Sequence, residues 1–292
     1  MLSNQNYKAI IIGAGPAGLF AAIRLAQAMR PDDTIRLAEG AREADPTPEP
    51  KAHSGILVLE GKEKPARKLL LSGSGQCNLT HAGPIADFLG HYGGGAKAQS
   101  AARFLKPALY YFDNRELLAW FEARGIQFET EENGKIFPAD RRASSILKVL
   151  QDEARRLAVH IETGNRVGAI QHSSGGFSVQ VEGRDSPYRS PLVLIATGGA
   201  SYPKTGSTGD GYALAAALGH RIVPPRPALA PVFIRDFSLK ALAGLSFSNA
   251  GLAVLREGKR IMTKRGDLLI THEGLSGPLI LDSSRFIQPG DI

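Results

Sequence analysis

The stretch that decides the fold is Ala9-Ile10-Ile11-Ile12-Gly13-Ala14-Gly15-Pro16-Ala17-Gly18-Leu19-Phe20-Ala21-Ala22. Its first four residues are apolar and largely β-branched, which predicts a short buried parallel strand. The residues from Ala17 to Met29 are mostly apolar or alanine and predict a helix packed against a sheet. The three glycines between them follow the G-x-G-x-x-G pattern, and its strand-to-helix context predicts a dinucleotide-binding loop.

Each glycine of this loop has an expected physical role. Gly13 allows the tight turn, Gly15 lets a pyrophosphate approach the backbone, and Gly18 lets the helix pack closely on the strand. The helix N-terminus then offers free N–H groups to the phosphates. A glycine-rich turn that binds nothing is the alternative, and the flanking strand and helix argue against it. The predicted cofactor contact covers the whole loop: Gly13, Ala14, Gly15, Pro16, Ala17 and Gly18.

Composition limits the class of protein. The chain has 292 residues, of which 43% are hydrophobic and 22% charged, as expected of a soluble globular protein. Its net charge is +7, but Lys and Arg are scattered without a run of five, so an anionic cofactor or small-molecule substrate is expected rather than a nucleic acid. Cys77 is the single cysteine, which excludes an intrachain disulfide and a C-x-x-C mechanism. Without a signal peptide or a stretch of 18 apolar residues, we expect a cytoplasmic protein with no membrane contact.

Two acidic residues compete for the ribose of the cofactor. Dinucleotide folds place this acid at the end of the second strand, about 20 residues past the glycines. Glu39 lies 21 residues beyond Gly18 and follows a possible short strand, whereas Glu60 lies 42 residues beyond it and ends the better strand, residues 56–60. Spacing therefore favours Glu39 and strand quality favours Glu60.

Five motifs resemble one family across essentially the whole chain. Besides the first loop they are RKLLLSGSGQCN at 67–78, LVLIATGG at 192–199, SYPKTGSTGDGY at 201–212 and THEGLSGP at 271–278, with KIFP at 135–138 as a lesser likeness. The chain resembles the BaiN/YhiN-like FAD-dependent oxidoreductases, also called aminoacetone-oxidase-like flavoproteins. In that family the ribose-binding Glu precedes the motif Lys by eight residues, which selects Glu60 with Lys68 and makes residues 31–55 look like an insertion.

The resemblance implies FAD as cofactor and extends the predicted contact. Ser74 and Gln76 stand where the family commonly has Gly and Arg, so a contact made by that Arg is not carried over. Beyond the first loop the implied cofactor-binding residues are Glu60, Lys68, Ser72, Gly73, Gly75, Cys77, Asn78, Val167, Thr197, Gly198, Gly199, Asp210 and Gly211.

The expected chemistry is hydride transfer through FAD. The family suggests NAD(P)H-linked reduction of an activated C=C bond, with NAD(P)H bound only transiently because no second G-x-G-x-x-G follows. A flavin-dependent amine oxidase is the alternative chemistry, and a non-catalytic flavin-binding or nucleic-acid-associated protein is the alternative class. His272 is the candidate proton donor to the substrate and Tyr202 a second candidate, although structural roles are the ordinary ones for both. No metal site is predicted.

The predicted fold class is α/β. We expect a Rossmann-like FAD-binding domain over residues 1–221, with a parallel sheet and an inserted antiparallel meander, and a partial, mostly-β substrate-covering domain over 222–292. The meander strands are predicted at 167–170 and 177–181 with a third beginning at Leu192, and a helix over 98–112 is expected to be kinked or broken at Pro107. Family members usually continue into a C-terminal return segment that completes the FAD domain, so a C-terminally truncated chain is expected.

Overall fold

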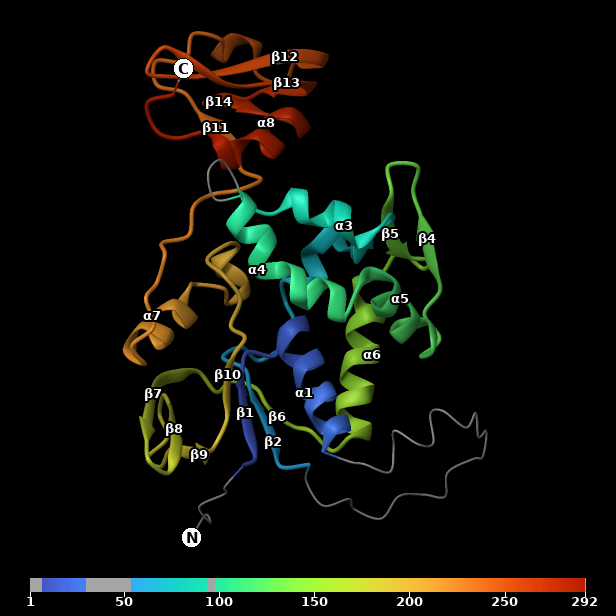
Figure 1. Ribbon diagram of the computed structural model, residues 1–292, viewed down its shortest axis with the longest axis vertical. Coiled ribbons are helices and arrows are strands. Elements are labelled where there is room, and N and C mark those ends of the chain that lie inside the picture. The colour runs from blue at the N-terminus through green and yellow to red at the C-terminus, as the bar shows by residue number, and fades with distance from the viewer. Residues whose placement is uncertain (1–6, 30–53, 94–97, 292) are drawn as a thin grey trace. The chain divides into compact units, whose positions relative to one another are not determined.

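The computed structural model describes residues 7–29, 54–93 and 98–291, and the chain divides into two compact units (Figure 1). The first unit combines Met1–Ala82 with Asn114–Val223, and the second combines Gly83–Asp113 with Pro224–Ile292. The contacts thus group residues 83–113 with the C-terminal part, whereas the sequence predicted a first domain running unbroken to residue 221. The proposed insertion at 31–55, apart from its last two residues, and Glu39 lie outside the described residues.

The described residues of the first unit form three small sheets and four longer helices. Its described elements are β1 Ala9–Ile12, α1 Pro16–Ala28, β2 Ile56–Leu59, η1 Leu69–Gly75, β3 Thr80–His81, α5 Asn114–Glu122, β4 Phe128–Thr130, β5 Lys135–Pro138, α6 Ala143–Arg156, β6 His160–Glu162, β7 Val167–Ser173, β8 Gly176–Val181, β9 Tyr188–Ser190, β10 Val193–Ile195, η4 Pro203–Thr205 and α7 Asp210–Ala217.

A parallel sheet in the order β10-β1-β2-β6 forms the centre of this unit. Ile12 pairs with Leu59 on one side and with Ile195 on the other, so the three strands end at the same level. All residues of β1 and β2 are buried, because the sheet is covered on both faces. The predicted Rossmann-like strand, glycine loop and helix are confirmed.

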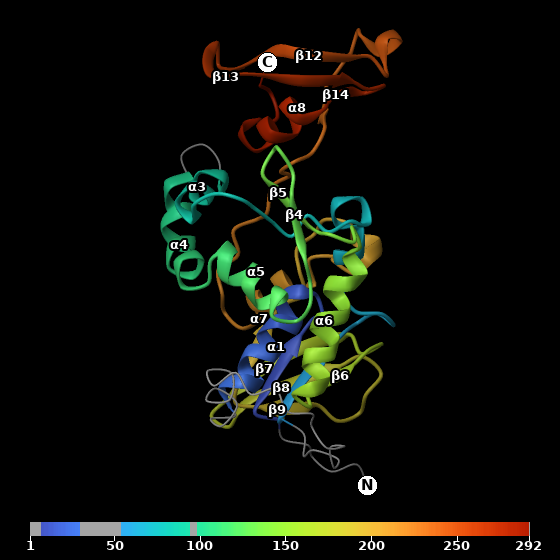
Figure 2. The same ribbon diagram turned by 90° about the vertical axis from the view of Figure 1, so that its right-hand side faces the viewer.

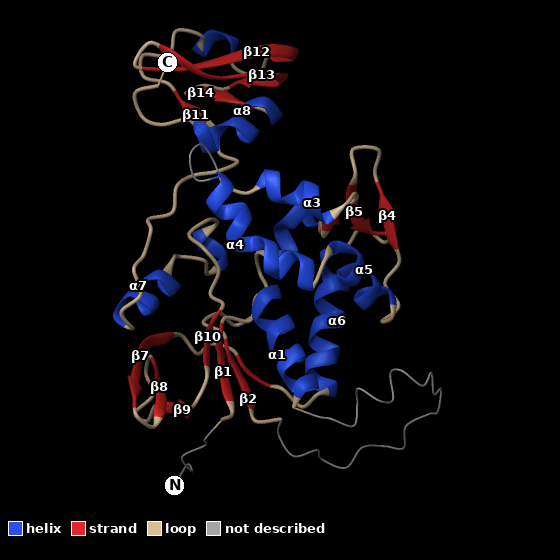
Figure 3. Ribbon diagram, in the orientation of Figure 1, coloured by secondary structure: helices blue, strands red, loops and turns tan. Residues whose placement is uncertain are grey.

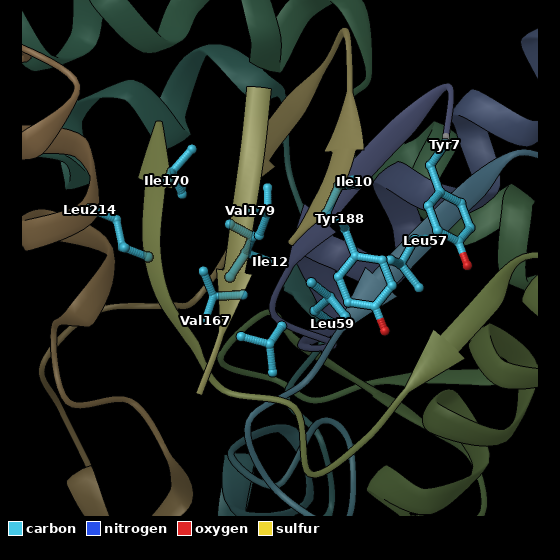
Figure 4. Close-up of a cluster of buried hydrophobic side chains, with 11 residues drawn as sticks. Tyr7, Ile10, Ile12, Leu57, Leu59, Val167, Ile170, Val179, Tyr188 and Leu214 are labelled. Atoms are coloured by element: carbon cyan, nitrogen blue, oxygen red, sulfur yellow. The ribbon is translucent and has the colours of Figure 1, made fainter. Parts of the chain in front are cut away.

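Helices cover one face of the sheet and a meander covers the other. Helices α1 and α6 run side by side along the sheet (Figure 2), while β7, β8 and β9 lie on its other side (Figure 1). Figure 4 shows the apolar cluster between the sheet and the meander. It comprises Tyr7, Ile10, Ile12, Leu57 and Leu59 from the sheet side, Val167, Ile170, Val179, Val181 and Tyr188 from the meander, and Leu214 from α7.

The third meander strand was predicted at the wrong place. It is β9, Tyr188–Ser190, whereas the strand predicted from Leu192 is β10 and belongs to the parallel sheet. Pro191 has no N–H to donate, so it separates the two strands. β9 alternates buried and exposed residues and lacks the apolar run that makes β10 conspicuous.

The second unit is built on an antiparallel sheet in the order β11-β14-β13-β12 (Figure 3). The two hairpin strands are longer than the strands predicted at 251–255 and 267–271. The prediction missed the added residues because most of them are polar or exposed. Helix α4 continues through Pro107, so of the predicted kink or break at this residue the break is wrong. The described elements are α3 Ile85–Phe88, η2 Leu89–His91, α4 Ala98–Tyr111, β11 Val232–Phe233, η5 Lys240–Leu242, β12 Ser246–Arg256, β13 Lys259–Ile270, β14 Gly274–Ser276, α8 Pro278–Ser283 and η6 Ser284–Phe286. Among the described residues, every helix is too short or too polar to cross a membrane.

Candidate functional site

A cleft of about 570 Å³ opens at the carboxyl ends of the parallel strands in the first unit. The chain leaves β1 toward β2 on one side, while β10 lies on the other side of β1. This is the switch point at which open α/β sheets bind ligands. The cleft is lined by the glycine loop, the end of β2, residues 165–167, residues 195–198 and the loop before α7.

The three glycines of the first loop have different surroundings. A Cβ on Gly13, whose φ is +105°, would lie 2.5 Å from the carbonyl oxygen of Ala196. A Cβ on Gly18 would lie 1.9 Å from the carbonyl oxygen of Gly13. A Cβ on Gly15 would meet nothing within 4 Å. Gly13 and Gly18 are therefore required by packing, whereas Gly15 presents open backbone to the cleft at the start of α1.

Glu60 lies directly after β2 and its carboxylate is held beside the glycine loop. One oxygen accepts a hydrogen bond from the backbone N–H of Ala14 and the other from the N–H of Lys62, each at 2.9 Å. The chain thereby ties the end of β2 to the loop after β1. These two hydrogen bonds fix the orientation of the Glu60 carboxylate, and Glu60 lines the cleft.

An ion pair joins two segments of the cleft wall. Arg166, just before β7, donates from its terminal guanidinium nitrogen to Asp210, the first residue of α7, at 2.8 Å and from Nε at 3.1 Å. Thr208 donates its hydroxyl to the other carboxylate oxygen. These hydrogen bonds, Thr208 first and Arg166 after it, lower the pKa of Asp210, so this carboxyl is ionised at neutral pH.

The second glycine loop turns sharply and is held by internal hydrogen bonds, in which the N–H of Gln76 donates to the Gly73 carbonyl and the N–H of Cys77 to the Ser72 carbonyl, each at 3.0 Å. Gly73, Ser74 and Gly75 have φ of +54°, +56° and +88°, and a Cβ on Gly73 would lie 2.8 Å from the backbone nitrogen of Asn78. Cys77 is buried at 1% exposure, and burial raises the pKa of its thiol. A buried, protonated thiol is a poor nucleophile, so packing explains this residue.

Ten of the predicted cofactor-binding residues line the cleft: Gly13, Gly15, Pro16, Ala17, Glu60, Lys68, Val167, Thr197, Gly198 and Asp210. The other predicted residues are not among its lining: Ala14, Gly18, Ser72, Gly73, Gly75, Cys77, Asn78, Gly199 and Gly211. Gly18 and Gly211 pack against residues that line the cleft. A Cβ on Gly211 would lie 2.3 Å from Thr197 Oγ1, and Gly18 packs on Gly13.

Sequence reasoning missed Lys62, Arg67 and the Arg166 side chain, all of which line the cleft. Their signal in the sequence is weak, because isolated cations are ordinary surface residues. Only their position after β2 or before β7 distinguishes them. The Lys62 side chain lies alongside Gly206, where a Cβ added to the glycine would be 3.1 Å from Lys62 Cγ.

The two candidate proton donors belong to different units. Tyr202 is 66% exposed with φ of +56°, and its carbonyl accepts the N–H of Thr205 in a turn of the first unit. His272 is exposed between β13 and β14 in the second unit. Their catalytic roles stay predictions. The described residues contain no group of three or more His, Cys, Asp or Glu side chains suited to a metal ion.

The sequence model of the HI0933-like protein Rossmann domain matches residues 48–276. The chain belongs to the HI0933-like family. This confirms the family predicted from the motifs, and with it an FAD-dependent oxidoreductase family.

Curated relatives of this HI0933-like chain act on different compounds. The 3-dehydro-bile acid delta(4,6)-reductase of Clostridium scindens is 31% identical over 280 residues, covering 96% of this chain and 60% of that protein. The ribosomal RNA dihydrouridine synthase of Escherichia coli is 29% identical over 287 residues, covering 98% of this chain and 62% of that protein. The chain thus spans about three fifths of the length of these relatives.

Among solved structures, 3-ketosteroid-delta4-(5alpha)-dehydrogenase from Rhodococcus jostii is similar with a TM-score of 0.45 and 17% identity. The similarity covers 68% of this HI0933-like chain and 47% of that enzyme.

Proposed function

We propose that the cleft of the first unit binds FAD and that the protein is a reductase of carbon–carbon double bonds conjugated to a carbonyl group. The observation that carries the FAD site is the position of the Glu60 carboxylate beside the open backbone of Gly15. An acid and a glycine with open space at its Cα, at the start of a helix, supply the two contacts that an adenosine diphosphate needs, one for ribose hydroxyls and one for the pyrophosphate.

The residues present fit this cofactor. Among the three loop glycines, only Gly15 has room on its Cα for an approaching group, while Gly13 and Gly18 are closed off by backbone. The cleft volume of about 570 Å³ lies within the range of small-molecule sites. Lys62, Arg67, Lys68 and Arg166 along its lining favour an anionic occupant. Bound FAD, once reduced by NAD(P)H, would supply the hydride that the reduction requires.

The type of reaction is supported by what the relatives' names share. A delta(4,6)-reductase of a 3-oxo bile acid and a synthase of dihydrouridine both saturate a C=C bond activated by a carbonyl group. We propose the same reaction class here, with NAD(P)H as the reductant. The substrate is either a small enone, as for the first relative, or a uracil within RNA, as for the second.

The experiment is to purify the chain, add FAD, remove free flavin by gel filtration and record the visible absorption. We expect retained flavin that bleaches with NADPH or NADH in the absence of oxygen. The reduced protein is then offered a 3-oxo-delta-4,6 steroid or a uridine-containing RNA, and mass spectrometry measures the gain of two hydrogens.

A pair of matched variants tests the ribose contact. Glu60→Ala removes the carboxylate from the cleft, and we expect it to retain much less flavin than wild type. Glu132→Ala makes the same chemical change at an exposed turn and should retain as much as wild type. A wild-type chain that holds no flavin, or equal retention in both variants, contradicts the proposed site.

A further inference from the structure

Helix α4 of the second unit presents large aromatic side chains to solvent. Phe104 is 82% exposed, Tyr111 is 80% exposed and Tyr110 is 51% exposed. Exposed aromatic side chains of this size are unusual in a helix of 14 residues and need an explanation.

The exposed aromatics are interleaved with positive charges. Phe104 and Tyr111 are seven residues apart and share one face of the helix, while Arg103, Lys106 and Tyr110 share the adjoining face. Lys106 Nζ lies 5.5 Å from the ring centroid of Tyr110. We call these five residues the aromatic–basic face of α4.

Among the described residues, no acidic side chain neutralises the positive charges on this face. Helix α4 contains no Asp or Glu, and within the described ranges neither Arg103 nor Lys106 forms an ion pair. A second copy of the chain would bring the same positive charges against it, which electrostatic repulsion disfavours. The face therefore fits a partner that is both polyanionic and rich in flat π surfaces.

We propose that the aromatic–basic face of α4 binds single-stranded RNA. Bases stack on exposed aromatic side chains while Arg and Lys contact the phosphates, and this combination defines surfaces that bind single strands. The inference rests on the proposed function, specifically on a uracil within RNA as the substrate. It departs from the sequence prediction of no nucleic acid, because a search for runs of Lys and Arg does not detect two cations spaced along one helix face.

The test is fluorescence anisotropy of the 292-residue chain with a labelled uridine oligonucleotide of about 12 nucleotides, a length within the range of single-strand sites. We expect binding that weakens as salt rises. Replacing both Phe104 and Tyr111 by Leu keeps the apolar surface but removes the rings, so Kd should rise about tenfold or more. Phe104→Tyr keeps a ring and should bind like wild type.

Charge variants and a matched control locate the contact. Arg103→Gln and Lys106→Gln should each reduce the slope of log Kd against log salt by about one or slightly less. Phe233→Leu changes another exposed aromatic side chain of the same unit, at 74% exposure, and should leave Kd unchanged. Circular dichroism checks that each variant is folded.

The proposal is overturned if wild type does not bind the oligonucleotide, if the double Leu variant binds as tightly as wild type, or if Phe233→Leu weakens binding equally. A dimer of wild type that Phe104→Ala with Tyr111→Ala converts to monomers would assign the face to a second copy instead. Flavin retention and steroid reduction of wild type are measured in parallel. A wild-type protein that retains flavin but does not bind RNA refutes this inference alone, whereas a wild-type protein without flavin refutes the proposed function.

Discussion

Two glycine-to-alanine substitutions in the first loop should separate stability from cofactor binding: Gly18→Ala should lower stability, and Gly15→Ala should weaken FAD binding. Gly18→Ala places a Cβ 1.9 Å from the carbonyl oxygen of Gly13, a backbone atom that moves only if β1 or α1 moves. Gly15→Ala places a Cβ in open space, and the backbone at Gly15, with φ of −72° and ψ of 175°, is one that alanine adopts readily.

The magnitudes follow from these distances. Overpacking a close contact costs about 1–3 kcal/mol and more where backbone must shift, so Gly18→Ala should lower the free energy of unfolding by about 3 kcal/mol or more. Gly15→Ala should change it by less than about 1 kcal/mol, because reduced freedom of the unfolded chain offsets a small loss at the helix cap. The added methyl group stands at the proposed pyrophosphate contact, so the Kd for FAD should rise about tenfold, which is ~1.4 kcal/mol.

The assay measures urea unfolding without cofactor and FAD binding by fluorescence quenching. Gly251→Ala is the matched control, since its Cβ also meets nothing within 4 Å and it lies in the second unit. We expect Gly251→Ala to leave the Kd for FAD unchanged and to raise the free energy of unfolding by less than about 1 kcal/mol, because alanine reduces the freedom of the unfolded chain. A Gly15→Ala variant that unfolds as easily as Gly18→Ala, or that binds FAD as tightly as wild type, would refute the division of roles between the glycines.

Three further predictions concern the first unit. Because hydrogen bonds lower the pKa of Asp210, the stability that its ion pair with Arg166 adds is present above the ordinary aspartate pKa of about 3.9 and is lost as the pH falls toward the lowered folded value. Asp210→Asn should thus cost under about 1 kcal/mol at pH 7, since Arg166 is 56% exposed, and nothing in acid. Tyr188→Phe removes the 2.5 Å hydrogen bond to the Glu162 carboxylate and should cost about 1.5–3 kcal/mol by urea unfolding. Burial of Cys77 should make native protein react slowly with iodoacetamide and unfolded protein rapidly.

Each of these predictions has a contradicting result. A difference between wild type and Asp210→Asn that grows in acid would reverse the sign of the linkage. Unchanged stability of Tyr188→Phe would mean that solvent replaces the hydrogen bond without loss. Rapid alkylation of the folded protein would show that Cys77 is accessible. Tyr92→Phe, at a half-exposed tyrosine of the second unit, is the control for the tyrosine change.

The strand, loop and helix around the first glycines could be predicted because local pattern and tertiary role agree there. Ile10 to Ile12 are apolar without alternation and are buried on both faces, and the helix that follows is apolar enough to pack on them. The ends of β1 and α1 lie within one residue of those predicted. The hairpin of β7 and β8 was predictable for the same reason.

Elements that depend on distant partners could not be predicted. The strand β9 has only three residues and is recognised by its pairing with β8, not by its composition. The hairpin of β12 and β13 extends through exposed polar residues, because cross-strand hydrogen bonds sustain it where no apolar alternation exists. The grouping of residues 83–113 with the C-terminal part arises from contacts between segments over 100 residues apart in sequence, such as the hydrogen bond from Arg285 to the carbonyl of His91.

The proposal of Glu60 as the cofactor acid rests on strand register rather than on spacing along the chain. The distance along the chain between glycines and acid measures only how much polypeptide intervenes, and this chain places 37 residues between Gly18 and Ile56. Strand register instead gives the position of a residue along the sheet. Leu59 pairs with Ile12, so the residue after each of these strands lies at the same edge of the sheet. Glu60 must therefore meet the loop after β1, and its bond to the Ala14 N–H follows from that register. Any other acidic residue that took the role of Glu60 would need to lie at the end of a strand that pairs with β1, whatever the number of residues between that acid and the glycines.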